Sequence, residues 1–267
     1  MPELRLPPIV PIDAAREADG VSTVICDARA YLDGRKGSDA YTDGHIPGAR
    51  HLDLENDFSG EPGPGIGRHP LPGAELFSAA LASAGIGPDT HVLAYDDAGG
   101  MIAGRLVWML RTLGQNAALL DGGIDAWTGD LETTAPSFDP VPCPVRHFPA
   151  AATVEADEVE AYIASGGVVV DVRGPDRFAG NTEPIDPEAG HIDGAINMPF
   201  TDNLDAGKYR PIEELGSEYA AQNIAEDTIY YCGSGVSACH TMLAAEAAGL
   251  GLGRLYVGSW SGYCTRT

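Results

Sequence analysis

The chain has 267 residues, enough for one large domain or two of ordinary size. Hydrophobic residues make up 44% and charged residues 21%, a balance typical of a globular protein rather than a disordered one. The formal net charge of -23 argues against nucleic acid and membrane surfaces as partners, because both attract clustered Lys and Arg. If the substrate is an anion, its site must be locally positive against this acidic background.

The sequence predicts a cytoplasmic protein. The segment 1–11 lacks the apolar core of a signal peptide, and no run approaches the roughly 18 apolar residues of a membrane helix. The odd, sparse set of five cysteines does not suggest a disulfide framework, and no CxxC pair suggests zinc. The cysteines are Cys26, Cys143, Cys232, Cys239 and Cys264.

Taken in chain order, the predicted elements repeat. An apolar strand ending in Asp-x-Arg occurs at 24–29 and again at 168–173, and each is followed by a GHIxGA turn. The strand at 91–96 matches the strand at 228–232, and a helical stretch follows both. The later matches share one register, because 232 − 96 and 263 − 127 both equal 136. We therefore predict two copies of one α/β domain.

Within each copy, Val- and Ile-rich strands alternate with amphipathic helices, which favours a mainly parallel sheet with helices on both faces. We place the N-terminal domain at 1–135 and the C-terminal domain at 151–267. The Pro-rich segment 136–150 is predicted to be the linker. Two segments rich in Gly, Pro and acidic residues, 56–73 and 180–189, are predicted to be long surface loops, and the second could border a cleft.

The strongest chemical signal is the sequence around Cys232. A β-rich run ends there, the loop Gly233–Ser237 follows, and a helical stretch continues to about Ala248 before Gly249. Ligands bind at the carboxyl ends of parallel strands. A glycine-rich loop and a helix N-terminus offer backbone N–H groups that favour a thiolate, so a lowered pKa is expected. The alternative is that Cys232 is a buried, unreactive core cysteine.

Two observations narrow the chemistry. The equivalent position in the first copy is Asp96, which cannot carry sulfur, so the N-terminal copy is predicted to be inactive. A cysteinyl-phosphate phosphatase needs an arginine six positions after its cysteine to grip phosphate oxygens. That position is Ala238. Sulfur transfer through a persulfide is therefore favoured over phosphate ester hydrolysis.

Cys232–Ala238 (CGSGVSA) resembles the active loop CGSGVTA of 3-mercaptopyruvate sulfurtransferases, whereas thiosulfate sulfurtransferases usually carry basic residues after the cysteine. The Asp-x-Arg strand ends and both GHIxGA turns also resemble tandem rhodaneses. The resemblance covers nearly the whole chain. It implies an inactive N-terminal rhodanese domain, an active C-terminal one and a site at their interface, with no metal or organic cofactor.

The resemblance also implies site residues. Cys232 is the catalytic sulfur carrier, Ser234 polarises the substrate, and Arg177 binds it. His45 and Asp33 match supporting residues of the N-terminal domain. The remaining loop residues are expected to bind substrate through their backbone: Gly233, Gly235, Val236 and Ser237.

One family feature is missing. A second substrate-binding arginine follows Glu-Pro in mercaptopyruvate enzymes, but here Ile185 and Asp186 follow Glu183-Pro184. The donor is thus expected to be a small anion, 3-mercaptopyruvate or thiosulfate. The acceptor is expected to be cyanide, a small thiol or a thioredoxin-like protein. The opposing hypothesis is a non-catalytic rhodanese-like module that binds partners, with an intact fold and no persulfide.

The repeat also indicates which residues have structural roles, because a residue that recurs in the inactive copy is not needed for catalysis there. His45 and His191 occupy equivalent turns, which favours a structural role for both. Asp171 and Arg173 are predicted to be structural, because the first copy repeats them. Cys239 lies about two helical turns after Cys232 and is predicted to be a core thiol.

Overall fold

The computed structural model describes residues 5–266 and contains two compact units. Residues 5–59 and 72–148 form the first unit, and residues 60–71 and 149–266 form the second. The predicted linker 136–150 therefore packs largely with the first unit, for example through the Val141 N–H that donates to the Ala82 carbonyl. The segment 60–71, which the sequence places inside the first copy, packs with the second unit.

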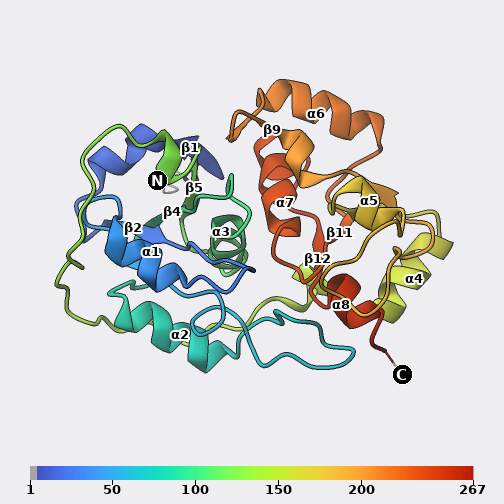
Figure 1. Ribbon diagram of the computed structural model, residues 1–267, viewed down its shortest axis with the longest axis horizontal. Coiled ribbons are helices and arrows are strands. Elements are labelled where there is room, and N and C mark those ends of the chain that lie inside the picture. Colours follow the sequence, from blue (N-terminus) through green and yellow to red (C-terminus); the bar gives the residue numbers. More distant parts are fainter. Residues whose placement is uncertain (1–4, 267) are drawn as a thin grey trace. The chain divides into compact units, whose positions relative to one another are not determined.

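The first unit is built on a five-stranded parallel sheet of order β1-β5-β4-β2-β3 (Figure 1). Its elements are β1 (Ile9–Pro11), η1 (Ile12–Glu17), β2 (Thr23–Asp27), α1 (Gly37–Asp43), β3 (Arg50–His51), α2 (Ala74–Ser83), β4 (His91–Tyr95), α3 (Ala103–Thr112), β5 (Ala117–Asp121) and η2 (Ile124–Ala126).

The second unit repeats this sheet in the order β6-β12-β11-β7-β8, again all parallel. Its elements are η3 (Ala150–Ala152), β6 (Thr153–Val154), α4 (Ala156–Ala164), β7 (Val169–Asp171), α5 (Pro175–Phe178), β8 (Ile196–Asn197), η4 (Phe200–Asn203), β9 (Leu204–Asp205), β10 (Lys208–Tyr209), α6 (Ile212–Ala221), β11 (Ile229–Tyr231), α7 (Ala238–Ala247), β12 (Arg254–Tyr256) and α8 (Ser259–Tyr263). Strands β9 and β10 form a separate antiparallel pair.

Both faces of each sheet are buried. In β2, consecutive residues Val24, Ile25 and Cys26 point to alternate faces, yet none is more than 4% exposed. In β11, all three residues are buried in the same way. A parallel sheet covered on both sides needs such continuous apolar strands, and this confirms the predicted fold of two α/β domains with helices on both faces. No helix of residues 5–266 combines the length and apolarity needed to cross a membrane.

Candidate active site

Cys232 lies directly after β11, which has β12 on one side and β7 on the other in the sheet. The side chain is only 2% exposed. The predicted helix after the loop is confirmed as α7, and its hydrogen-bonded end at Gly249 matches the glycine stop. This places the cysteine at the carboxyl edge of the sheet, beside the N-terminus of a ten-residue helix.

The loop surrounds the sulfur with donors. The Gly235 N–H donates to Cys232 Sγ with an N···S distance of 3.1 Å, and Gly235 has a positive φ of 75°, which glycine adopts easily. Burial raises the pKa of Cys232, but the Ser237 hydroxyl and the backbone N–H groups of Ser234 and Ala238 outweigh it, so the net pKa is lowered. Val236, in the same loop, is buried at 5% exposure.

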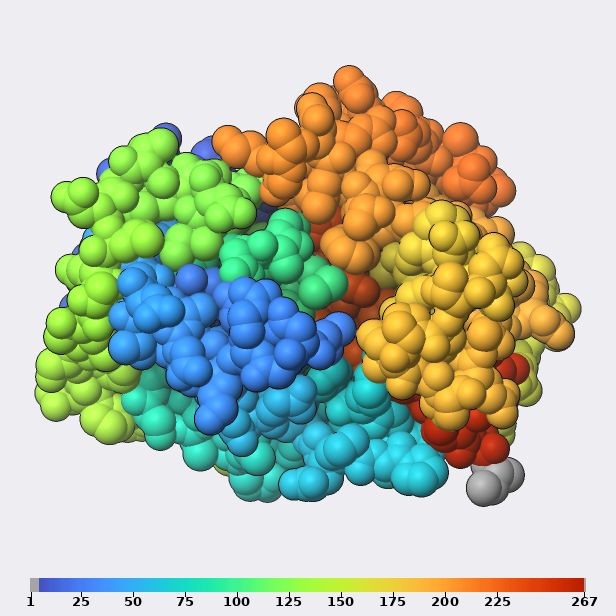
Figure 2. All heavy atoms as spheres, viewed as in Figure 1, coloured from blue at the N-terminus to red at the C-terminus, as the bar shows by residue number. Residues whose placement is uncertain are grey.

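The segment 60–71 docks beside α8, as the light-blue and red atoms in Figure 2 show. Two glycines make the close approach possible. A Cβ on Gly67 would lie 2.6 Å from the Gly258 carbonyl oxygen, and one on Gly262 would lie 3.0 Å from the Gly65 carbonyl oxygen. The Gly65 N–H donates to the Thr265 hydroxyl at 3.0 Å. This docking brings Arg68 and His69 to the Cys232 loop.

His69 contacts the predicted catalytic serine. Its Nδ1 lies 2.8 Å from Ser234 Oγ, and the two residues are 5% and 7% exposed. The loop backbone is fixed next to this pair, because the Arg68 N–H donates to the Ser261 hydroxyl at 3.1 Å. The serine is thus oriented by a histidine that the sequence alone did not predict.

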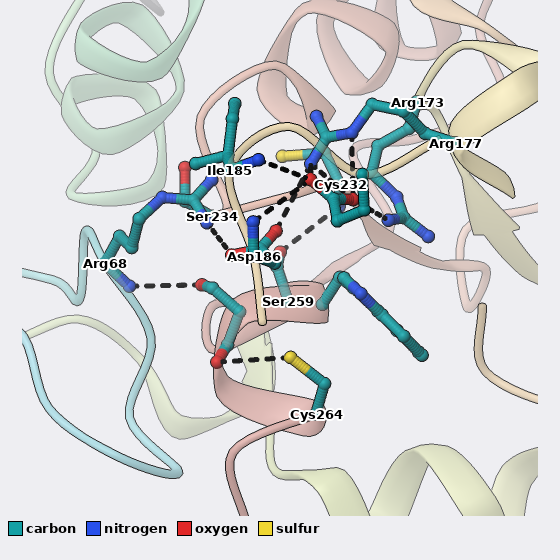
Figure 3. Close-up of polar contacts among 12 residues, drawn as sticks. Arg68, Arg173, Arg177, Ile185, Asp186, Cys232, Ser234, Ser259 and Cys264 are labelled. Atoms are coloured by element: carbon teal, nitrogen blue, oxygen red, sulfur yellow. Dashed lines mark hydrogen bonds and ion pairs between the residues drawn. The ribbon is translucent and has the colours of Figure 1, made fainter. Parts of the chain in front are cut away.

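Alternating charges form a chain from the strand end to this loop (Figure 3). Arg173 binds Asp171 at 2.7 Å and also reaches Glu183 at 3.3 Å. Glu183 accepts from Arg177 at 2.8 Å. Asp186 then joins Arg177, at 3.2 Å, to Arg68. The carboxylates of Glu183 and Asp186 are almost fully buried, with side-chain exposures of 3% and 2%.

Two guanidinium groups of this chain lie over Gly233. A Cβ placed on that glycine would be 3.0 Å from Arg68 Nη2 and 3.5 Å from Arg177 Nη1. The two arginine side chains stay 28% and 22% exposed, so solvent reaches them. The locally positive site that the acidic composition demanded therefore comes from two arginines as well as from backbone N–H groups.

The Asp-x-Arg strand ends have the predicted structural geometry in both units. Arg29 grips Asp27 through Nε and Nη2, and its Nη2 also donates to the Gly44 carbonyl at 2.8 Å. Arg173 grips Asp171 in the same way and donates to the Gly190 carbonyl at 2.6 Å. Each pair ties a strand end to the start of a GHIxGA turn.

The two turn histidines are likewise equivalent. His45 Nδ1 lies 2.8 Å from the Tyr41 carbonyl oxygen, and the ring stacks on Tyr41. His191 Nδ1 lies 2.7 Å from the Phe178 carbonyl oxygen, and its ring stacks on Phe178. This repeated geometry argues for a structural role of His45, in the first unit, over the supporting role that the resemblance implied.

Asp33 lies in the first unit, with its side chain 59% exposed, and it pairs with Arg35 at 2.9 Å. Cys239 is fully buried in α7, as expected of a core thiol.

Asp96 follows β4 just as Cys232 follows β11. Its carboxylate is buried and accepts four backbone hydrogen bonds at 2.7–2.9 Å. Burial raises the pKa of Asp96, and these four N–H groups oppose that effect. The donors belong to Ala98, Gly100, Ile102 and Ala103. The first unit thus fills the loop with a buried carboxyl group that accepts four backbone hydrogen bonds.

Comparison with known proteins identifies the family. The family model described as "Rhodanese-like domain" matches this chain twice, at residues 12–130 and 155–266. A protein of Pseudomonas aeruginosa named "Probable 3-mercaptopyruvate sulfurtransferase" is 39% identical over 253 residues, covering 91% of this chain and 89% of the relative. The "Putative thiosulfate sulfurtransferase SseB" of Mycobacterium tuberculosis is 37% identical over 246 residues, covering 89% and 86%.

Solved structures that superpose on this chain are also sulfurtransferases. The 3-mercaptopyruvate sulfurtransferase from Leishmania major superposes with a TM-score of 0.83 at 32% identity, covering 98% of this chain and 75% of that one. SseA from Escherichia coli, a 3-mercaptopyruvate sulfotransferase by its description, gives 0.81 at 30% identity, covering 96% and 100%. Both halves of the chain match the same domain, and the relatives align over most of its length. The chain therefore belongs to the rhodanese family of sulfurtransferases.

Proposed function

We propose that the protein transfers sulfur from a small anionic donor to a thiophilic acceptor through a persulfide on Cys232. The observation that carries this proposal is the buried sulfur held by the Gly235 N–H, with a lowered pKa. A thiolate in such surroundings is a nucleophile at neutral pH. The names of the relatives point to 3-mercaptopyruvate and thiosulfate as donors.

The chemistry balances for either donor. The Cys232 thiolate attacks the transferable sulfur and forms an S–S bond. With thiosulfate, the donor's own S–S bond breaks and sulfite leaves with the electron pair. With 3-mercaptopyruvate, the C–S bond breaks, the electron pair passes to carbon as an enolate, and a proton then gives pyruvate.

Ser234 and His69 fit a polarising role. With Nδ1–H of His69 donating to Ser234 Oγ, the serine proton is free to donate to an oxygen of the donor as negative charge develops there. Arg177 supplies positive charge beside Gly233. The acceptor, which we propose to be cyanide, a small thiol or a thioredoxin-like dithiol, then attacks the outer sulfur and restores the Cys232 thiolate.

The proposal places this activity in the reducing cytoplasm, which suits five free thiols. It includes no nucleic-acid or membrane partner. It also treats the N-terminal domain as inactive, because its loop holds Asp96 instead of a thiol.

The test is mass spectrometry of the intact protein after incubation with each donor. We expect one added sulfur, about 32 Da, on the wild type and none on Cys232→Ser. Cys239→Ser, which changes a buried thiol of the same helix, is the matched control and should still load. Loading of Cys232→Ser, or a wild type that loads with neither donor, would contradict the proposal.

A further inference from the structure

Arg68 is a candidate substrate-binding residue. It belongs to the segment 60–71, which the sequence assigns to the N-terminal domain but which packs with the unit that holds Cys232. Ile185 occupies the position after Glu183-Pro184 at which the family resemblance implies a second arginine, and it is 42% exposed. The segment 60–71 nevertheless brings a guanidinium to the same loop. Figure 3 shows Arg68 approaching Asp186 and Ser234 from the opposite side to Arg177.

Each of the two arginines keeps an amino group without a partner among residues 5–266. Arg177 uses Nε and Nη2 on Glu183 and Asp186, which leaves Nη1. Arg68 uses Nη1 on Asp186, which leaves Nη2. These two nitrogens lie 3.5 and 3.0 Å from a Cβ placed on Gly233, and the paired Arg177 Nη2 lies beside them at 3.4 Å.

Asp186 fixes the spacing of the pair. Its Oδ1 binds Arg68 and its Oδ2 binds Arg177, so one buried carboxylate holds both side chains and leaves their remaining N–H groups facing Gly233. Arg68 is electrostatically close to the nucleophile. Burial lowers the pKa of Arg68, and the Cys232 thiolate acts in the opposite direction.

We propose that Arg68 is a second donor-binding residue, whose Nη2 grips the anionic group of the sulfur donor together with Nη1 of Arg177, above Gly233. This rests on the function proposed above. A carboxylate or a sulfonyl group has two or more oxygens and takes one N–H on each. The anion site is thus completed by a residue of the segment 60–71 instead of by the residue after Glu183-Pro184.

Steady-state kinetics test the role during turnover. Because a hydrogen bond to a charged group contributes about 1.5–3 kcal/mol, Arg68→Ala should raise the donor KM about tenfold to a hundredfold. A purely binding role predicts a smaller change in kcat. Arg68→Lys should recover part of the loss, because it keeps charge but not the planar fork. Arg210→Ala removes a surface arginine of the same unit that pairs with Glu218, and it should behave as wild type.

A rescue variant separates the anion site from loop folding. Arg68→Ala combined with Ile185→Arg returns a guanidinium to the loop that already carries Asp186, and the donor KM should move back toward the wild-type value. If KM of Arg68→Ala lies within twofold of wild type, as for Arg210→Ala, the proposal is wrong. A raised KM that Ile185→Arg does not lower at all also counts against it, because the defect then lies in the loop.

Binding without turnover distinguishes this proposal from the sulfur-transfer proposal. Pyruvate and sulfite are the two donor remainders, and calorimetry can measure their binding to Cys232→Ser, which cannot carry sulfur. Binding that weakens at least tenfold when Arg68→Ala is added supports the anion site, even if the wild type loads no sulfur. Equal binding in both proteins, or no binding of either probe, overturns it.

Discussion

Asp96 and Cys232 hold the same place in two copies of one fold, and each accepts backbone hydrogen bonds from the loop that follows it. The Asp96 carboxylate accepts four, whereas Cys232 Sγ accepts the Gly235 N–H at 3.1 Å. A loop of this kind is a cradle for negative charge. In the first unit the group in the loop is a structural carboxyl, and in the second it is a thiol whose pKa is lowered and which can react as a thiolate.

Asp96→Ala should therefore destabilise the first unit. The change leaves four buried N–H groups without an acceptor, and each such loss costs about 1–3 kcal/mol. We expect the free energy of unfolding to fall by about 3 kcal/mol or more in urea titrations. Asp89→Ala, at an exposed position of the same unit, is the control and should change it by less than about 0.5 kcal/mol. Similar urea unfolding midpoints for Asp96→Ala and Asp89→Ala would show that the hydrogen bonds to Asp96 do not stabilise the first unit.

Ser237→Ala should shift the pH dependence of Cys232 reactivity. Only the thiolate reacts, so the alkylation rate rises with pH through the Cys232 pKa, which lies below its ordinary value. Loss of the Ser237 hydroxyl removes the strongest of the effects that lower this pKa, so the rise should move to higher pH.

The measurement is the rate of iodoacetamide modification at Cys232 between pH 5 and 10, followed by peptide mass spectrometry. Ser237→Thr keeps the hydroxyl and should retain the wild-type midpoint. An unchanged midpoint in Ser237→Ala would show that the backbone N–H groups alone set the pKa.

The sequence predicted the repeated fold well because local patterns determine it. Continuous apolar strands, the Asp-x-Arg ends and the glycine stop of α7 need no long-range information, and the structure confirms the two parallel sheets. Arg68 and His69 escaped prediction for a physical reason. They reach Cys232 only because residues 60–71, about 165 positions earlier, dock beside α8, and the signal available was one Arg-His pair within a loop rich in Gly and Pro.

Arg29→Ala should lower stability without lowering sulfur transfer per folded molecule. Arg29 and Asp27 are a buried pair in the first unit, at 2.6 Å, and removal of one partner of such a pair costs about 3–5 kcal/mol. Arg35→Ala breaks an exposed pair with Asp33 and should cost less than about 1 kcal/mol. Urea unfolding and kcat/KM of both variants check this. Arg29→Ala with wild-type stability would disprove the structural assignment.

His69 and Ser234 should act as one unit in turnover. We expect His69→Ala and Ser234→Ala each to lower kcat about a hundredfold, and the double variant to be little worse than either, because each change breaks the same 2.8 Å contact. His45→Ala is the control: it removes a buried stacked ring and should lower the melting temperature while kcat stays near wild type. Multiplicative losses in the double variant would show that the two residues act independently.

Gly262→Ala tests whether the docked segment 60–71 is needed for the site. A Cβ at this position would lie 3.0 Å from the Gly65 carbonyl oxygen and 3.2 Å from the Gly67 nitrogen, which are backbone atoms that cannot move without the loop. Displacing the loop withdraws Arg68 and His69 together, so kcat/KM should fall more than tenfold. Protease cleavage within 60–71 should become faster, because the loop loses its contacts.

Gly73→Ala is the matched control for this change. Gly73 lies just beyond the docked segment, its φ of -56° suits any residue, and a Cβ there meets no atom within 4 Å. It should keep wild-type kcat/KM and cleavage rates, and the loss of glycine freedom in the unfolded chain should stabilise it by a few tenths of a kcal/mol or more. If Gly262→Ala matched this control in both measurements, the Cys232 loop would have to work without the residues that 60–71 supplies. The anion site and the polarised serine would then lose their structural basis.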